Sequence, residues 1–265
     1  MKKLLAIVCS FLLLVSGAAL FTACGNTITI PYPNPEGEEA YVIKVGVTNY
    51  EPMDYKDENG QWIGFDADLA KKAFNELGYD VTYVEIDWDF KVTSLDSGEI
   101  DVIWNGMTIT DELREKVALT DPYLTNQQVI VVKTENLSKF ETTADLSNAT
   151  SIVFEKGSAA ETELEKLSLD ESKLLGASKQ LDAFFEVNAG SCEVAVVDKT
   201  MAQSLCGTGS YTGLSYKEIG FEPEYFAAGF RKSDSEMAER INTLLAKYAQ
   251  DGTIDALKAK YGITL

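Results

Sequence analysis

Residues 66–86, DADLAKKAFNELGYDVTYVEI, carry two hydrophobic periodicities in succession, and these decide the fold. The first part spaces its apolar residues along one face of a helix, and Gly78 stands where such a helix would stop. The run VTYVEI (81–86) is typical of a strand, as is the run YVIKVGV (41–47) that precedes the helix. A strand, a helix and a second strand in this order predict an α/β protein.

The same alternation continues on both sides of this stretch. Further strands are predicted in IDVIWN (100–105), QVIVVK (128–133) and YFAAGFRK (225–232), and a helix in WDFKVTSLDSG (88–98). A second strand and helix series begins after residue 150, and the chain closes with two helices broken at Asp251 and Gly252. We therefore expect two α/β lobes joined by two crossing strands, with a cleft between them. The second series is SIVFEKGSAAETELEKL (151–167), LDAFFEVNAG (181–190) and CEVAVVDKTMAQSL (192–205).

The composition excludes several classes of function. The 42 acidic and 23 basic residues give a formal charge of −19, which repels nucleic acid. The chain has no histidine, the commonest general base near neutral pH and the commonest zinc ligand. We expect a folded protein, because 45% of the residues are hydrophobic, and we expect no metal and no cofactor.

The N-terminus has the features of a segment that directs export. A basic start, MKK, precedes an apolar run at 4–21, and small residues then lead to Cys24. This pattern resembles a bacterial lipoprotein signal, which implies that residues 1–23 are removed and that Cys24 is lipidated. The protein would then be anchored to the outer face of the cell membrane. An uncleaved membrane helix, or secretion with Cys24 incidental, remains an alternative.

The next residues, 24–39, are predicted to be a tether. The stretch NTITIPYPNPEGEE (26–39) contains three prolines within five positions and fits no helix or strand pattern. A proline-rich extended chain is a semi-rigid spacer.

Two cysteines, Cys192 and Cys206, remain in the predicted folded part. Export permits a disulfide between them. Two separate buried thiols are the alternative, because Cys192 opens a predicted strand and Cys206 follows the next helix.

Six phrases, in order from Val45 to Gly262, resemble the family-3 extracellular solute-binding proteins, the polar amino acid receptors of ATP-driven importers. The resemblance implies a two-lobed, type II periplasmic-binding-protein-like fold, with lobe 1 formed by 40–129 and 227–265 and lobe 2 by 130–226. It implies a monomeric binding protein, not an enzyme, that delivers a small ligand to a membrane permease. The phrases are NGQWIGFDADLAKKAFNELG, SGEIDVIWNGMTITDE, LTDPY, KGSAAETE, AVVD and DGTIDALKAKYG.

The resemblance places the first ligand contacts in lobe 1. Asn49 and Tyr50 follow the first strand, where ligands of open α/β sheets usually bind. Tyr50 and Trp88 would form two aromatic walls that clamp an apolar stem or hold a cation. For each of them, an ordinary place in the core is the alternative.

The loop that ends the strand at 100–105 is expected to grip a carboxylate. Its residues are Asn105, Gly106, Met107 and Thr108, and Thr110 can cap the helix that follows. The family's arginine would stand at the position of Leu113, and Arg114 lies one residue further, about 100° around an ideal helix. Arg114 either enters the cleft or is a surface charge.

Lobe 2 supplies the remaining candidates. Gly157, Ser158 and Ala159 match a glycine turn before a helix, whose free amides suit an anion. Asp198 ends the apolar run CEVAVVD, where its carboxylate would receive the ligand's amino group; a helix N-cap role is the alternative and is compatible with it.

The predicted function is capture of an amine-bearing solute, a polar amino acid, by closure of the lobes about hinges near 125–131 and 224–229. An amine without an α-carboxylate is an alternative, because the arginine is displaced. A dehydratase of the same fold, using Asp198 or Glu155 as acid or base, is a second alternative. A sensory ligand-binding protein is a third, disfavoured because no transmembrane helix follows Leu265.

Overall fold

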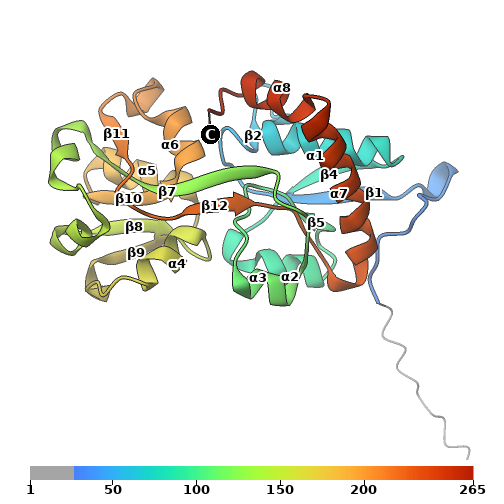
Figure 1. Cartoon of the computed structure of the whole chain (residues 1–265), viewed down its shortest axis with the longest axis horizontal. Coiled ribbons are helices and arrows are strands. Elements are labelled where there is room, and N and C mark those ends of the chain that lie inside the picture. Colours follow the sequence, from blue (N-terminus) through green and yellow to red (C-terminus); the bar gives the residue numbers. More distant parts are fainter. Residues whose placement is uncertain (1–26, 265) are drawn as a thin grey trace, which may run out of the picture.

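The first lobe is built around a five-stranded sheet with the order β4-β1-β5-β13-β6. The computed structural model describes residues 27–264. Strand β1 pairs in parallel with β4 and β5, and β13 runs antiparallel between β5 and β6. Because β13 comes from the end of the chain, both ends of the sequence build this lobe (Figure 1). The strands are β1 (Val42–Val47), β4 (Asp80–Glu85), β5 (Val102–Ile103), β6 (Ala118–Leu119) and β13 (Gly229–Phe230).

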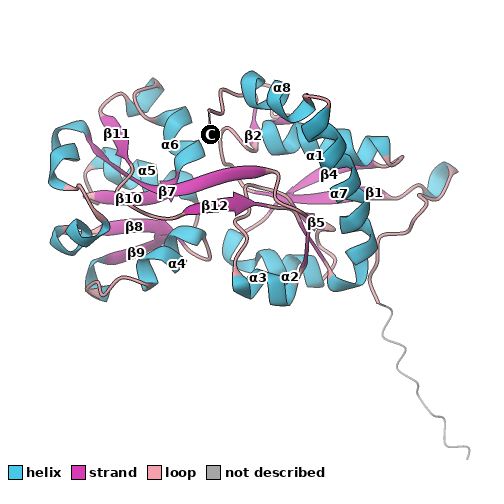
Figure 2. Cartoon of the chain, viewed as in Figure 1, coloured by secondary structure: helices cyan, strands magenta, loops and turns pink. Residues whose placement is uncertain are grey.

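Five α-helices and a short hairpin, together with short 3-10 helices, complete the described part of the first lobe (Figure 2). Helix α1 buries the apolar face predicted for it, including Leu69, Ala73 and Phe74, and ends before Gly78, whose φ of 87° favours glycine. The helices are α1 (Phe65–Glu76), α2 (Lys91–Asp96), α3 (Asp111–Lys116), α7 (Ser235–Gln250) and α8 (Thr253–Lys260), and the hairpin is β2 (Tyr55–Lys56) with β3 (Trp62–Ile63).

The second lobe has a sheet of order β11-β7-β10-β8-β9, with β12 paired to β7 outside this path. Strands β8, β9 and β10 are parallel, so their carboxyl ends meet at one edge. The strands are β7 (Leu124–Lys133), β8 (Ile152–Glu155), β9 (Leu174–Ala177), β10 (Val194–Asp198), β11 (Leu214–Lys217) and β12 (Pro223–Phe226), and the helices are α4 (Ala159–Glu165), α5 (Gln180–Ala189) and α6 (Lys199–Leu205).

Strands β7 and β12 carry the chain between the lobes. They pair antiparallel, with Asn126 opposite Glu224 and Thr125 opposite Tyr225, and they run side by side in Figure 1. The predicted two-lobed α/β fold with two crossing strands is confirmed. The positions of the lobe boundaries, 129/130 and 226/227, stay a prediction.

The strand predicted at 225–232 is two strands, β12 and β13. Between them, the amide of Ala227 donates to the carbonyl of Met107 at 3.0 Å, and the amide of Ala228 donates to Oγ1 of Thr120 at 3.0 Å. These bonds take the backbone out of the ladder and turn it from one sheet to the other.

Residues 28–41, most of which belong to the predicted proline-rich tether, lie against the first lobe. The amide of Ile30 donates to Oδ1 of Asp234 at 2.7 Å, and the hydroxyl of Tyr79 donates to the carbonyl of Pro31. Asn34 donates to the carbonyls of Tyr41 and Gly78 at 3.1 and 2.9 Å and accepts from the amide of Tyr41 at 2.7 Å. These bonds fix the backbone of the segment on the first lobe, and a tether role for residues 24–39 stays a prediction.

The predicted signal peptide and the predicted lipidation site Cys24 lie outside the described residues. Within residues 27–264, every helix is too short or too polar to cross a membrane.

Replacing Asn34 with alanine is expected to lower the free energy of unfolding by about 1–2 kcal/mol, because three hydrogen bonds of the docked segment are lost. Urea unfolding followed by circular dichroism measures the change. The matched control is Asn148→Ala at an exposed site, expected to change stability by less than about 0.5 kcal/mol. An equal effect of the two substitutions would contradict the docking.

The predicted disulfide between Cys192 and Cys206 is absent, since both carry free thiols. Cys192 is part of the hydrophobic core of the second lobe, and Cys206 packs against that core. Burial raises the pKa of both thiols, to about 12 for Cys206. The two residues fill apolar space, which was the alternative.

Candidate functional site

Asp198 stands at the carboxyl end of β10, on the edge of the second sheet that faces the first lobe, and it is 6% exposed. Its Oδ1 accepts from the side-chain amides of Asn126 and Gln128 at 2.6 and 2.7 Å. Its Oδ2 accepts from the side chain of Gln180 at 2.6 Å, and Gln180 also accepts from the amide of Asp198 at 2.9 Å. The carboxylate is thus held in one orientation by three neutral amides.

Two further carboxylates belong to the same cluster. Glu155 ends β8, beside β10, and is 4% exposed. Glu224 lies on β12, and its Oε1 accepts from Asn126 and Gln128 at 2.5 and 2.8 Å, the same two amides that bind Asp198. Asp198, Glu155 and Glu224 are called the carboxylate cluster below.

Burial sets the electrostatics of the carboxylate cluster. Loss of hydration, followed by the charge of Asp198, raises the pKa of Glu155 to about 8 and that of Glu224 to about 8. Burial also raises the pKa of Asp198, although the hydrogen bonds of Gln180 and Gln128 oppose this shift. A cation placed among these groups would favour their ionised forms, so the cluster suits a positively charged partner.

The two predicted aromatic walls come from the first lobe. Tyr50 is 3% exposed, and its hydroxyl is hydrogen-bonded to Oγ1 of Thr200 in the second lobe. Trp88 is 7% exposed and opens the 3-10 helix Trp88–Phe90. Nζ of Lys91 lies 4.9 Å from the centre of the Trp88 ring. Both rings therefore stand at the junction of the lobes.

The loop after β5 is shaped by buried polar contacts. Oδ1 of Asn105 accepts from the amide of Thr48, and Nδ2 of Asn105 has no hydrogen-bond partner among residues 27–264. Gly106 has a φ of 56°, and its amide donates to Oδ2 of Asp66 at 2.6 Å. A Cβ at this glycine would lie 2.6 Å from the Tyr50 ring, so the close approach also requires glycine. Thr108 follows, beside the crossing strand β12.

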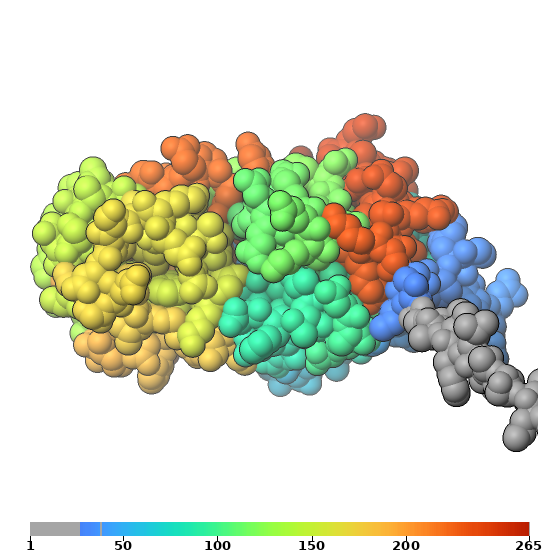
Figure 3. Space-filling view, turned by 90° about the horizontal axis from the view of Figure 1, so that it is seen from below, coloured from blue at the N-terminus to red at the C-terminus, as the bar shows by residue number. Residues whose placement is uncertain are grey.

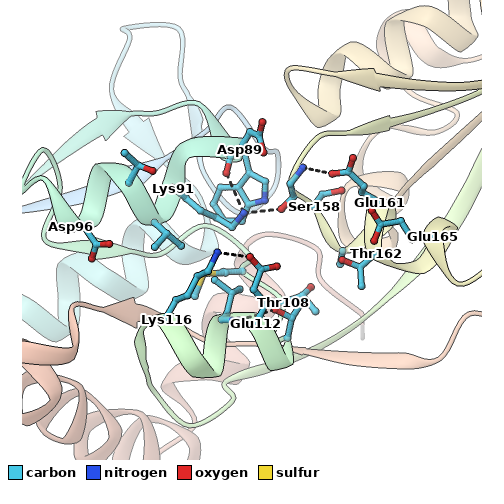
Figure 4. A pocket seen from close by; sticks show the side chains of 18 residues that line it. Asp89, Lys91, Asp96, Thr108, Glu112, Lys116, Ser158, Glu161, Thr162 and Glu165 are labelled. Carbon is cyan, nitrogen blue, oxygen red and sulfur yellow. Dashed lines mark hydrogen bonds and ion pairs between the residues drawn. The ribbon is translucent and has the colours of Figure 1, made fainter.

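The glycine turn of the second lobe touches the first lobe. Nζ of Lys91 donates to the carbonyl of Gly157 at 2.7 Å and to the carbonyl of Trp88 at 3.2 Å, as Figure 4 shows. The amide of Gly157 donates to Oε2 of Glu161 at 2.6 Å, and Oγ of Ser158 has no hydrogen-bond partner in the part of the chain that the structure describes. The first free amide expected for an anion is therefore occupied by the protein's own carboxylate.

A cavity of about 20 Å³ between the lobes adjoins a more open one of about 600 Å³. In Figure 3 the yellow residues of the second lobe lie directly against the teal and green residues of the first. Among the predicted site residues, those that line the small cavity are Tyr50, Trp88, Asn105, Gly106, Thr108, Ser158, Ala159 and Asp198. Met107 and Gly157 line the larger cavity. Four residues line both cavities: Trp88, Thr108, Ser158 and Ala159.

Asn49 and Arg114 line neither cavity. Oγ1 of Thr110 accepts from the amide of Leu113 at 3.1 Å and so caps α3. In the helix that begins after this cap, Leu113 is buried and Arg114 is exposed. The helix phase therefore turns Arg114 away from the cleft and places Leu113 beside the larger cavity.

Sequence reasoning missed several polar residues at the site. Glu155 was considered only as an acid or base of the enzyme alternative, although it ends an apolar run as Asp198 does. Thr48 and Gln180 line the small cavity. Asn126 and Gln128 donate hydrogen bonds to Asp198, and Glu224 is a member of the carboxylate cluster. The sequence carried no signal for Asn126 and Gln128, because their partner Asp198 lies 72 and 70 positions away.

The family model "Bacterial extracellular solute-binding proteins, family 3" matches residues 43–264. The chain belongs to this family. As a family-3 protein, it is a solute-binding protein of the kind that serves amino acid ABC transporters.

Curated relatives match this family-3 protein over nearly its whole length. The arginine-binding extracellular protein ArtP of Bacillus subtilis is 28% identical over 254 residues, which cover 94% of this chain and 96% of the relative. The probable histidine-binding protein of Campylobacter jejuni is 27% identical and covers 98% and 99% of the two chains. Relatives of this kind are extracellular or periplasmic binding proteins.

Solved structures share the fold. A P235GK mutant of ArgBP from T. maritima superposes with a TM-score of 0.77 at 31% identity, covering 83% of this chain and 94% of that one. An ancestral arginine-binding protein bound to arginine gives 0.77 at 32% identity, covering 83% and 97%. The ancestral amino acid-binding protein AncCDT-1, a precursor of cyclohexadienyl dehydratase, gives 0.75 at 32% identity, covering 83% and 95%.

Proposed function

We propose that this family-3 protein captures a polar amino acid in the cleft and delivers it to the permease of an ABC importer. The observation that carries the proposal is Asp198, a buried carboxylate on the cleft, oriented by three amides and without a cationic partner among the described residues. A ligand ammonium group is the partner that such a carboxylate lacks. The amino acids named for the relatives, arginine and histidine, all carry this group.

The proposal includes anchoring of the protein at the outer face of the cell membrane through lipidated Cys24. Its support is the sequence pattern of residues 1–24 and the extracellular or periplasmic place of the relatives. With residues 28–41 docked on the first lobe, the anchor would hold that lobe close to the membrane.

Capture proceeds by closure of the lobes about β7 and β12. In the structure, contacts cross the cleft from Lys91 to the carbonyl of Gly157 at 2.7 Å and from Ser204 to Oε1 of Glu51 at 3.2 Å. Such contacts exist only in a closed form, so a ligand that touches both lobes shifts the population towards it.

An amine without an α-carboxylate is the second candidate, because no described arginine lines either cavity and Leu113 stands where the family's arginine would be. A dehydratase activity is the third, since AncCDT-1 is a precursor of such an enzyme. Mass spectrometry of the bound compound after incubation distinguishes binding from turnover.

A ligand panel tests the proposed function. We expect L-arginine, L-lysine or L-histidine to raise the melting temperature and to reduce the radius of gyration in small-angle scattering, because binding energy is linked to both folding and closure. Putrescine and choline test the second candidate. The control variant Asp182→Asn alters an exposed acid of the same lobe and should leave both responses unchanged. Saturation without any change in radius would contradict closure, and the absence of any amine ligand would contradict the function.

A further inference from the structure

The three members of the carboxylate cluster differ in what surrounds their oxygens. Both oxygens of Asp198 accept hydrogen bonds, and Oε1 of Glu224 accepts two. Oε1 of Glu155 is buried and accepts none from the described residues, although Glu155 lines the small cavity. An unsatisfied buried carboxylate oxygen is costly, so this atom calls for a partner that enters the cavity.

The protein supplies no counter-ion for this oxygen. Among the described residues, no lysine or arginine forms an ion pair with Glu155, Asp198 or Glu224. Lys91 is the cation whose charge acts on Glu155, but its Nζ is committed to the carbonyls of Gly157 and Trp88. One ammonium group on the ligand cannot satisfy the whole cluster if Asp198 already receives it.

We propose that Glu155 is the specificity-determining residue of the cleft, and that its unpaired oxygen binds a second cationic group of the ligand. The ligand class is then a diamino or guanidino acid, or a diamine, in preference to a neutral amino acid. This inference rests on the proposed function and names the substrate class of the same site.

The approach to the site favours the same class. The larger cavity, which shares Trp88 and Thr108 with the small one, is lined by more acids than bases, as the labelled side chains of Figure 4 show. Such a mouth concentrates cations. The acids are Asp89, Asp96, Glu112, Glu161 and Glu165, and the bases are Lys91 and Lys116.

Binding of a second cation has a consequence for protons. Without ligand, burial and the charge of Asp198 raise the pKa of Glu155 to about 8, so that most Glu155 carboxyls are protonated at pH 7. A ligand cation lowers this pKa, and a proton leaves as the ligand binds. The groups that share the titration are Asp198, Glu224 and Lys91. Affinity for such a ligand should therefore rise between pH 6 and pH 8.

The test compares the protein with its Glu155→Gln variant, which keeps the shape and removes the charge. Calorimetry at pH 7 in phosphate and in Tris gives the dissociation constants for L-arginine, L-lysine and L-glutamine and the number of protons released. We expect Glu155→Gln to weaken binding of the stronger basic ligand by about tenfold or more, to leave L-glutamine within about threefold, and to reduce proton release. Glu171→Gln, at an exposed glutamate of the same lobe, is the matched control and should change none of these quantities.

The outcomes separate the inference from the proposed function. If Glu155→Gln binds the basic ligands as tightly as the unaltered protein does, the role of Glu155 is wrong and the function stands. If the unaltered protein binds no amine, the function itself is wrong. If the variant does not fold, calorimetry of the unaltered protein tests the inference by itself. Tighter binding of L-glutamine than of either basic amino acid overturns it. Binding of a basic amino acid without proton release also overturns it.

Discussion

Replacing Arg231 with methionine is expected to lower the free energy of unfolding by about 3–5 kcal/mol, the usual cost of removing one partner from a buried ion pair. Arg231 is 4% exposed and lies between two buried acids. Its Nη2 donates to Oδ1 of Asp101 at 2.9 Å, and its Nε donates to Oδ2 of Asp234 at 2.7 Å. Urea unfolding monitored by circular dichroism measures the loss.

The large effect follows from how many segments meet at this guanidinium. Its Nη1 donates to the carbonyls of Leu95 and Ile100 at 3.2 and 2.8 Å. Asp101 in turn accepts from the hydroxyl of Tyr41 at 2.8 Å, and Asp234 accepts from the amide of Ile30 at 2.7 Å. The group therefore joins α2, the residues before β5, the docked N-terminal segment and the turn between β13 and α7.

Arg114→Met is the matched control for this prediction. Arg114 is exposed on α3 and should change stability by less than about 0.5 kcal/mol. A loss of stability in Arg231→Met no larger than in this control would mean that the buried network is not coupled to folding.

The sequence predicted the elements whose signals are local. The helix over 66–78 and the strands beside it follow from apolar periodicity, and Asp198 could be placed on the cleft because it ends a buried parallel strand. The network around Arg231 could not be predicted, because only Asp234 is a near neighbour in the chain. The other partners, Leu95, Ile100 and Asp101, lie 130 or more positions away.

Two other features depended on how segments pack in the folded protein. Thr110 caps α3 as its sequence predicts, but which side of the helix is buried depends on packing, and the structure buries Leu113 and exposes Arg114. The proline-rich segment was read as a tether, yet the amide of Ile30 bonds to Asp234, 204 positions away. Composition did not indicate where this segment lies, nor that Gly37–Glu39 would form a 3-10 helix at its end.

Asp198→Asn is expected to weaken amino acid binding by about 30-fold or more, since truncating one partner of a buried charged pair costs about 2–5 kcal/mol. The substitution keeps the size of the side chain and removes the charge that the ligand ammonium would meet. Isothermal titration calorimetry with L-arginine and L-lysine measures the change, and the exposed Asp182→Asn variant of the same lobe is the control.

The fold should survive this substitution, because two effects on stability oppose each other. The new amide NH₂ group faces the Nε2 of Gln180, which donates to Oδ2 of Asp198 at 2.6 Å, and Gln180 is fixed by accepting from the backbone amide at 2.9 Å. This unfavourable contact costs about 1–3 kcal/mol. Loss of a buried negative charge offsets it, because Asp198 raises the pKa of both Glu155 and Glu224.

The same substitution separates the roles of the carboxylates. With the charge at position 198 removed, the pKa values of Glu155 and Glu224 should both fall, so fewer protons are released when a cation binds at pH 7. Asp198→Asn should weaken every ligand that carries an amino group, whereas Glu155→Gln should weaken only those with a second cation. Binding of L-arginine within about threefold of the unaltered protein would show that the ammonium group is not held at Asp198. The proposed place of the ligand in the cleft would then be wrong, because no other described carboxylate combines this burial with three fixed amide donors.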